Sequence, residues 1–579
     1  MKCRKWCLLI STTVFAFLSV SGQHVITNGD FEKGLDSWST NADSENFNAA
    51  FSVVAEGDAA IDRSLQVRVN QVDDTYWAFK FHHIELEQSG FSMNRFDVFK
   101  LSLRTKGSAN SLMLQAGLAR DNKDNAGFYE LDDHAMVNIP LAEQWQQHEI
   151  EIIASETTED VRFVLRFGEK TGTYLVDDVI LEKVSEFDDQ QWMENADKRI
   201  DSLRKGYFKI TVLDENNRPV PDAQVAISLA GHKFMWGTSV YWVTPQRWNR
   251  KRYQWERQEI LKTFNTIVNE DDFKWPQMEP KQGRVIYENV DLYAAWAAEN
   301  NIRMRGHCLV WPKQGVYLPK WFEALPVSKA KEALKTRIQR EMNYYAGKIC
   351  EYDVLNEPVH NPFLGDWLGD SIYHNMFTWA RQADPTAELY VNEWWNFDYW
   401  DHYRFRRYVD SLLSKGTPID GLGLQGHMDR PFNWLQFKFK LDYLAEAGFP
   451  LKITEFDVNV DGLGLTLKEQ AQYYYDMMHL AFSHPAMDGF LIWGLTDGWR
   501  DNSGIYNDDF SPRPAAGMMH HLIKEKWHTQ TNGITNDNGE FNFFGFKGVY
   551  DVTVKSGTEQ NQFRISLDGD NPKHTISLD

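Results

Sequence analysis

Eight short apolar runs lie between Phe234 and Trp527, and stretches with helical spacing separate them. Strands that alternate with helices pair in parallel through helical crossovers, and eight such strands close into a barrel. The sequence therefore predicts an α/β fold with a (β/α)8 TIM barrel over residues 234–527. In chain order the runs are FMWGTSV, FNTIVNE, IRMRGHC, YDVLNE, LYVNE, LGLQGH, LKITEFD and GFLIWG.

Polar residues gather at the C-terminal ends of these runs, which is the end where barrels of this type hold their active sites. They are Glu270, His307, Asn356, Glu357, Asn392, Gln425, His427, Glu455 and Asp457. Any one of them alone could equally be a structural ion-pair partner. A whole ring of buried amides, imidazoles and carboxylates is costly unless something uses it, so together they predict a catalytic site.

The residue types at these strand ends restrict the chemistry. No Ser, Cys or Lys stands there beside a base, no His and carboxylate cluster has metal-ligand spacing, and no glycine-rich phosphate loop is present. We therefore expect no cofactor and no metal in the catalytic site. Two glutamates, Glu357 and Glu455, fit the cleavage of a glycosidic bond, which needs one carboxyl group as an acid and a second that attacks or activates water.

The two glutamates have different sequence contexts. Glu357 lies in an Asn-Glu-Pro segment ahead of a loop rich in Trp and His, and we expect it to be the acid with the raised pKa. Glu455 has His427 as a strand-end partner that could keep it ionised, with Asp457 behind the imidazole. That arrangement is typical of a nucleophile.

Five segments in this order resemble glycoside hydrolase family 10, the endo-1,4-β-xylanases. They are FNTIVNEDDFKWPQMEP at 264–280, RGHCLVWPKQ at 305–314, NEP at 356–358, GLGLQGHM at 421–428 and ITEFDV at 453–458, and the flanks are similar to the plant-type branch. The resemblance implies a retaining enzyme in which Glu357 is the acid/base and Glu455 the nucleophile, supported by His427 and Asp457. It also implies substrate-binding roles for Glu270, Lys274, His307, Trp311, Gln314, Asn356, Asn392, Gln425, Trp493, Trp499 and Arg500.

Two positions depart from the family pattern. Asp271 stands where the family usually has Asn, and Pro312 stands where a His commonly follows the Trp. An ionised Asp can only accept hydrogen bonds. Both positions fall on the glycone side of the bond, so we expect the subsite preference to differ from that of a typical member.

Two other functions are compatible with these residues. A β-1,4-glucanase or mannanase on the same barrel would share both glutamates, although Lys274, Trp493 and Trp499 favour xylan. A catalytically silent polysaccharide-binding protein would have lost one of the glutamates, and both are present.

The first residues follow the plan of a secretory signal, with Lys2, Arg4 and Lys5 ahead of an apolar run. We expect residues 1–22 to be cleaved and the protein to be secreted, in the periplasm or outside the cell, with no membrane attachment afterwards. A net charge of −21 argues against a nucleic-acid partner. The expected partner is xylan or a related plant cell-wall polysaccharide, and the expected state is a monomer.

Residues 23–185 show short alternating strands that predict a β-sandwich, whose two ends resemble jelly-roll carbohydrate-binding modules. The candidate sugar-stacking residues are Tyr76, Trp77, Phe128 and Tyr129, although each one alone is better explained as sandwich core. Asp30, Glu32 and Asp178 could hold a structural calcium ion.

The remaining segments connect and flank the barrel. Residues 186–204 predict a helical linker, residues 205–233 a β segment, and residues 528–579 a C-terminal β extension that we expect to meet it. Beyond the signal only Cys308 and Cys350 remain, and we expect both to be free thiols.

Overall fold

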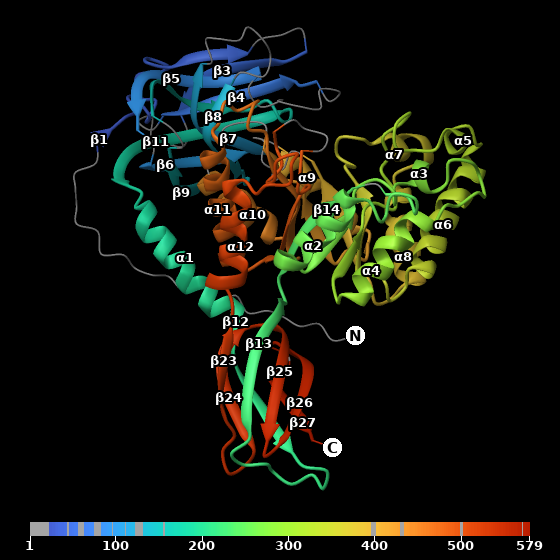
Figure 1. Ribbon diagram of the computed structural model, residues 1–579. Coiled ribbons are helices and arrows are strands. Elements are labelled where there is room, and N and C mark those ends of the chain that lie inside the picture. The colour runs from blue at the N-terminus through green and yellow to red at the C-terminus, as the bar shows by residue number, and fades with distance from the viewer. Residues whose placement is uncertain are drawn as a thin grey trace. The chain divides into compact units, whose positions relative to one another are not determined.

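The computed structural model describes residues 23–42, 46–55, 63–73, 83–94, 96–109, 112–121, 131–154, 157–241, 243–394, 401–428, 434–497, 502–569 and 571–578. The chain divides into two compact units, residues 1–188 and residues 189–579. Figure 1 shows the elements and labels those for which there is room.

The first unit consists of two antiparallel sheets, which confirms the predicted β-sandwich. Its core is built by alternation, as on β4, where Leu65, Val67 and Val69 are buried and the residues between them are more exposed. One sheet contains β1 (Gln23–His24), β3 (Asn48–Ala55), β4 (Arg63–Gln71), β6 (Asp97–Gly107), β9 (Gln146–Ile153) and β11 (Gly172–Glu186). The other contains β2 (Ser39–Ala42), β5 (Ile84–Met93), β7 (Met113–Asp121), β8 (Leu131–Pro140) and β10 (Thr158–Arg166).

The second unit contains the predicted barrel. Each of the eight apolar runs forms a strand, neighbouring strands are parallel, and the pairing of β19 with β21 closes the ring. The strands are β14 (Met235–Val240), β15 (Thr266–Asn269), β16 (Arg303–Gly306), β17 (Glu351–Asn356), β18 (Glu388–Glu393), β19 (Gly421–Leu424), β21 (Leu451–Val458) and β22 (Met487–Ile492). A two-residue strand, β20 (His427–Met428), continues beside β21, so His427 lies opposite Asp457. The (β/α)8 fold is confirmed.

Helices alternate with these strands along the chain (Figure 1). They are α2 (Lys251–Thr263), α3 (Trp275–Met278), α4 (Glu288–Glu299), α5 (Lys320–Glu323), α6 (Val327–Tyr344), α7 (Phe363–Leu368), α8 (Ser371–Ala383), α9 (Asp401–Ser414), α10 (Trp434–Ala445), α11 (Leu467–Ser483) and α12 (Pro514–His521), followed by a π-helical turn, Leu522–Lys526. Helix α11 illustrates why they form. Thr466 and Glu469 make a capping box at its start, and Tyr474, Met477 and Ala481 form a buried stripe at helical spacing.

The barrel interior holds charged side chains as well as apolar ones. Arg305 of β16 pairs with Glu351 (2.7 Å) and with Asp353, both of β17, and Lys452 of β21 also pairs with Glu351. All four residues are fully buried. Each charge has a partner, and such pairing is what makes buried charges tolerable.

A helix and two small sheets flank the barrel. After α1 (Asp189–Arg204), β12 (Lys205–Leu213) pairs with β24 (Glu540–Phe546) and β27 (Lys573–Ser577). Strand β13 (Gln224–His232) lies between β23 (Gln530–Ile534) and β25 (Gly548–Ser556), and β26 (Glu559–Leu567) pairs with β25. The segments before and after the barrel in the chain therefore meet in shared sheets.

Two further observations concern the described part of the chain. Cys308 and Cys350 are both free, as predicted. None of its helices combines the length and the apolar composition needed to cross a membrane.

Candidate active site

Glu357 follows the last residue of β17, and its backbone is in the left-handed region with a φ of 53°. Its N–H donates to the carbonyl of Asn392 on the next strand (2.8 Å). Three side chains donate to its carboxyl group: Gln425 to Oε1 (2.9 Å), and Trp311 (3.0 Å) and Asn361 (3.1 Å) to Oε2. A strained backbone position at a strand end is typical of a functional residue, and here it aims a carboxyl group at fixed donors.

The surroundings of Glu357 favour its protonated form. The side chain is only 4% exposed, and burial is the main reason that its pKa rises to about 7. The carboxylates of Glu393 and Glu455 raise the pKa further, and the amide of Gln425 partly opposes them. A carboxyl group with this pKa carries a proton in a large share of molecules at neutral pH, as a general acid must.

Glu455 lies on β21 and receives a different set of partners. Its N–H donates to the carbonyl of Gln425 (2.7 Å), and its Oε1 accepts a hydrogen bond from the amide of Asn392 (2.8 Å). The imidazoles of His307 and His427 approach it from two sides, with Nδ1 of His307 3.8 Å from Oε1 and Nε2 of His427 3.5 Å from Oε2. The carboxylate is therefore surrounded by groups that favour its charge.

Electrostatics keep Glu455 ionised and His427 charged. Burial alone would raise the pKa of Glu455, but His307 and His427 outweigh it and hold that pKa below its ordinary value. Burial would lower the pKa of His427, but Asp457, whose Oδ1 is 3.0 Å from Nδ1, and then Glu455 outweigh it and raise it to about 9. An imidazolium beside a carboxylate stabilises an anion that is ready to attack.

His307 connects the site to the buried charges of the barrel. Its Nδ1 lies 2.9 Å from Oδ2 of Asp353, which also pairs with Arg305. The sequence predicted His307 as a site residue, whereas Asp353 was not predicted. The available signal was an acidic residue inside an apolar strand, four positions before Glu357.

Three charged residues, Glu270, Asp271 and Lys274, interact with one another near the site. Nζ of Lys274 lies 2.9 Å from Oδ1 of Asp271, and Asp271 is the main reason that the pKa of Lys274 is raised despite its burial. Burial and then Asp271 raise the pKa of Glu270 to about 7, and Glu455 and His427 also act on it. The predicted residue Glu270 therefore lies within electrostatic range of Lys274, Glu455 and His427.

Other predicted residues have varied positions. Trp493 is buried and its ring packs edge-on against His307 (5.4 Å) and His427 (6.2 Å). Asn356 accepts a hydrogen bond from Asn392 (2.9 Å), whereas Gln314 is exposed on the loop after β16. Six predicted residues lie outside the described ranges: Trp499, Arg500, Tyr76, Trp77, Phe128 and Tyr129.

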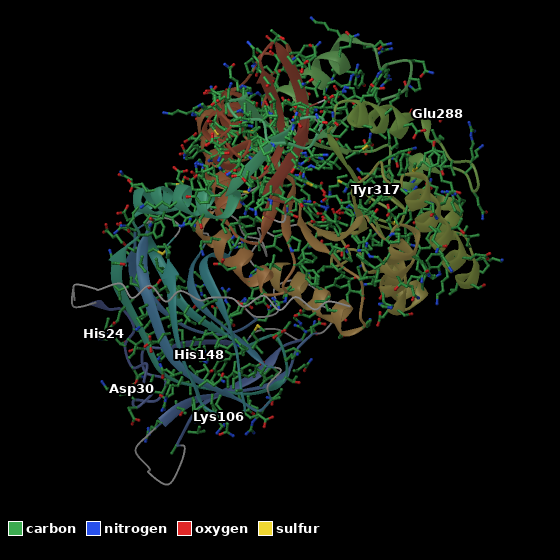
Figure 2. The ribbon with its side chains drawn as sticks, turned by 90° about the horizontal axis from the view of Figure 1, so that it is seen from below. His24, Asp30, Lys106, His148, Glu288 and Tyr317 are labelled. Carbon is green, nitrogen blue, oxygen red and sulfur yellow. The ribbon has the colours of Figure 1, made fainter. Side chains whose placement is uncertain are left out.

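The three acidic residues expected to bind calcium have other partners. Asp178 pairs with Arg104 (3.0 Å), and Glu32 accepts a hydrogen bond from the backbone of Arg63 (3.0 Å). Asp30, which is labelled in Figure 2, accepts a hydrogen bond from the backbone of Glu32 (3.4 Å). Within the described ranges, no group of three or more His, Cys, Asp or Glu side chains could hold a metal ion. The structure does not bring Asp30, Glu32 and Asp178 together as a metal site.

Several contacts at the site were not predicted. Asn361 donates to Glu357, and Glu393 pairs with His360 (2.7 Å) while it accepts from the backbone of Val359 (2.8 Å). Glu393 directly follows Asn392 at a strand end, so the same strand-end rule would have found it. Asn361 and His360 lie in the loop after Glu357, where sequence spacing carries no such signal.

Comparison with known families gives one match over the barrel. Residues 225–521 match the model of the family described as glycosyl hydrolase family 10, which is 51% of the chain. The matched segment contains both glutamates and all eight strands of the barrel.

Named relatives match similar parts of the chain. Anti-sigma-I factor RsgI6 of Acetivibrio thermocellus is 32% identical over 65% of this chain and 50% of its own length. Endo-1,4-beta-xylanase 1 of Arabidopsis thaliana is 33% identical over 55% of this chain and 34% of its own length. The chain thus spans half or less of the length of these two relatives. Among solved structures, native xylanase 10B from Thermotoga maritima has a TM-score of 0.46 at 23% identity, covering 51% of this chain and 96% of that one.

Proposed function

Since the chain belongs to glycosyl hydrolase family 10, we propose that it is a retaining endo-1,4-β-xylanase that hydrolyses internal β-1,4-xylosidic bonds of xylan. Glu357 is the acid/base and Glu455 is the nucleophile. His427 and Asp457 support the nucleophile.

The observation that carries this proposal is the contrast between two buried carboxyl groups at one end of the barrel. The pKa of Glu357 is raised to about 7, chiefly by burial, while the imidazoles around Glu455 hold its pKa low in spite of burial. Two carboxyls whose environments separate their pKa values are the arrangement that an acid and a nucleophile require.

The chemistry proceeds in two displacements. First, Glu357 donates its proton to the glycosidic oxygen while a carboxylate oxygen of Glu455 bonds to the anomeric carbon, and the bond from that carbon to the leaving oxygen breaks. Next, the Glu357 carboxylate takes a proton from water, whose oxygen displaces Glu455 from the same carbon. Two inversions restore the original configuration.

Xylan is the substrate that the site and the relatives favour. Trp493 packs edge-on against His307 and His427, and Lys274 lies near the ring of Trp311. Xylose lacks the hydroxymethyl group of glucose, so a pocket shaped for xylose excludes glucose by steric contact. Similarity to proteins named endo-1,4-beta-xylanase, such as xylanase 1 of Arabidopsis thaliana, supports the same substrate.

Comparing reducing-sugar release from xylan, carboxymethylcellulose and mannan tests the substrate. We expect release from xylan to exceed release from the other two at matched concentration. Equal rates on xylan and carboxymethylcellulose would contradict the substrate, and binding of xylan without any release would favour a silent polysaccharide-binding protein.

We also propose where the protein acts and what its oligomeric state is. Residues 1–22 are cleaved as a signal, and the mature protein acts outside the cytoplasm as a monomer on cell-wall polysaccharide. N-terminal sequencing of the mature protein and light scattering in solution test these statements. An unprocessed N-terminus or a dimer mass would contradict them.

A further inference from the structure

The loop between β16 and α5 turns back on itself directly beside the site. Gly315 has a φ of 73°, a conformation that glycine adopts without strain, and its N–H donates to Oε1 of Glu323 (2.7 Å). The N–H of Tyr317 donates to the carbonyl of Lys313 (3.0 Å). This tight turn brings the ring of Tyr317 back over Trp311, six positions earlier in the chain.

The two rings form a close stack. The centroids of Trp311 and Tyr317, the latter labelled in Figure 2, are 3.7 Å apart, and the ring planes differ by 12°. Nζ of Lys274 lies 5.3 Å from the indole centroid and 5.1 Å from the phenol centroid, and Asp271 holds that ammonium group in place. Aromatic stacking and an adjacent cation together fix the indole plane.

The fixed indole has a polar contact of its own. Nε1 of Trp311 donates to Oε2 of Glu357 (3.0 Å). The backbone before it is tied to β17, since the N–H of Leu309 and the carbonyl of Val310 form hydrogen bonds of 2.9 and 3.0 Å with that strand. Those bonds place the Cα of Trp311, but the direction of its N–H depends on the rotation of the side chain. Tyr317 is the aromatic ring stacked against that side chain.

We propose that Tyr317 is a positioning residue for the acid/base carboxyl, because its ring holds the Trp311 indole in the rotation that donates to Glu357. The inference rests on the acid/base role proposed above for Glu357. Misplacing a general acid matters most when the leaving group needs a proton. Loss of Tyr317 should therefore slow the cleavage of poor leaving groups and spare good ones.

The test compares Tyr317→Ala with the wild-type enzyme on two aryl β-xylobiosides, one with dinitrophenol and one with unsubstituted phenol as leaving group. The parameter kcat/KM reports the first displacement for both. We expect Tyr317→Ala to lose about tenfold or more on the phenyl substrate and on xylan, with little change on the dinitrophenyl substrate, since general acid catalysis is worth roughly 10²–10⁴-fold.

Two control variants isolate the stack. Tyr317→Phe keeps the ring and should retain wild-type rates on both substrates. Tyr344→Ala removes one ring of another stacked pair, Tyr287 and Tyr344 (3.9 Å), which lies on the helical layer, and it should change neither rate.

The outcomes distinguish failure of the positioning role of Tyr317 from failure of the proposed function. Three results would overturn the positioning role. They are equal losses of kcat/KM on both aryl substrates, no loss on either substrate, and a loss in Tyr317→Phe as large as in Tyr317→Ala. A wild-type enzyme that cleaves neither xylan nor the aryl xylobiosides would instead overturn the proposed function.

Discussion

Nε2 of His427 lies 3.5 Å from Oε2 of Glu455, and on its other side the same imidazole lies 3.0 Å from Asp457. With a pKa raised to about 9, His427 is a cation held between two carboxylates. Its charge helps keep Glu455 ionised in a buried position, where a carboxylate without partners would take up a proton.

Removing the imidazole should move the acidic side of the pH profile. Burial raises the pKa of Glu455, and the imidazoles of His307 and His427 oppose that effect. His427→Ala removes one of these two imidazoles, so the pKa of Glu455 rises. In the proposed mechanism activity needs Glu455 in its ionised form, so the acidic limb of kcat/KM should move to higher pH by roughly one unit or more. Asp457→Asn should cause a smaller shift in the same direction. An unchanged acidic limb in His427→Ala would contradict the support role.

The alkaline limb should respond to Glu393. In the proposed mechanism activity falls as Glu357 loses its proton, so this limb reports the pKa of Glu357. Burial is the main cause that raises this pKa, and the Glu393 carboxylate raises it further. Glu393→Gln keeps an acceptor for the backbone of Val359 but removes the charge, so the limb should move to lower pH by a few tenths of a unit to one unit. A shift to higher pH, measured by kcat/KM from about pH 5 to 9, would show that another group controls this limb.

Stability should depend on the buried charges of the barrel. Lys452→Ala leaves the fully buried Glu351 with Arg305 as its remaining cation, and breaking such a buried pair costs about 3–5 kcal/mol. Urea unfolding followed by tryptophan fluorescence measures this loss. Lys329→Ala, which removes an exposed pair with Glu332, is the matched control and should leave the midpoint unchanged. Equal urea midpoints for both variants would contradict a stabilising role of the buried pair between Lys452 and Glu351.

Acid should destabilise the second unit through His232. This imidazole is buried among Trp236, Phe482 and Phe546, and burial lowers its pKa from 6.5 to about 3. Between these two pKa values His232 binds a proton in the unfolded chain but not in the folded chain. The free energy of unfolding is therefore highest above pH 6.5 and falls as the pH drops towards 3. His232→Leu should show a shallower loss of unfolding free energy between about pH 6 and 4, by a few kcal/mol. Parallel curves for variant and wild type would contradict this.

The sequence predicted the barrel because its signals are local. Each strand is a short apolar run, and each polar residue at its end, such as Glu455 in LKITEFD, is read directly from the run. Because parallel strands in a closed barrel present their C-terminal ends together, the meeting of Glu357, Gln425 and His427 followed from topology alone.

Contacts set by loops and by distant partners could not be predicted in this way. The stack of Tyr317 on Trp311 depends on a turn through Gly315, and the charge on Asp353 is balanced by Arg305 on a neighbouring strand. The sequence separation of the two residues in each of these contacts does not follow the period of a helix or a strand. Only the folded structure therefore shows that they meet. Asp178 shows the converse, because an acidic residue that looked like a metal ligand pairs with Arg104.

The most direct test of the proposed catalytic role of Glu455 is the hydrolysis of xylan by Glu455→Ala, measured together with xylan binding. We predict that hydrolysis is abolished while binding remains largely intact, because the variant loses the carboxylate that attacks in the proposed mechanism and keeps the sugar contacts. Glu288→Ala, which removes an exposed carboxylate at the start of α4 (Figure 2), should leave both unchanged. Undiminished turnover in Glu455→Ala would show that Glu455 is not the nucleophile.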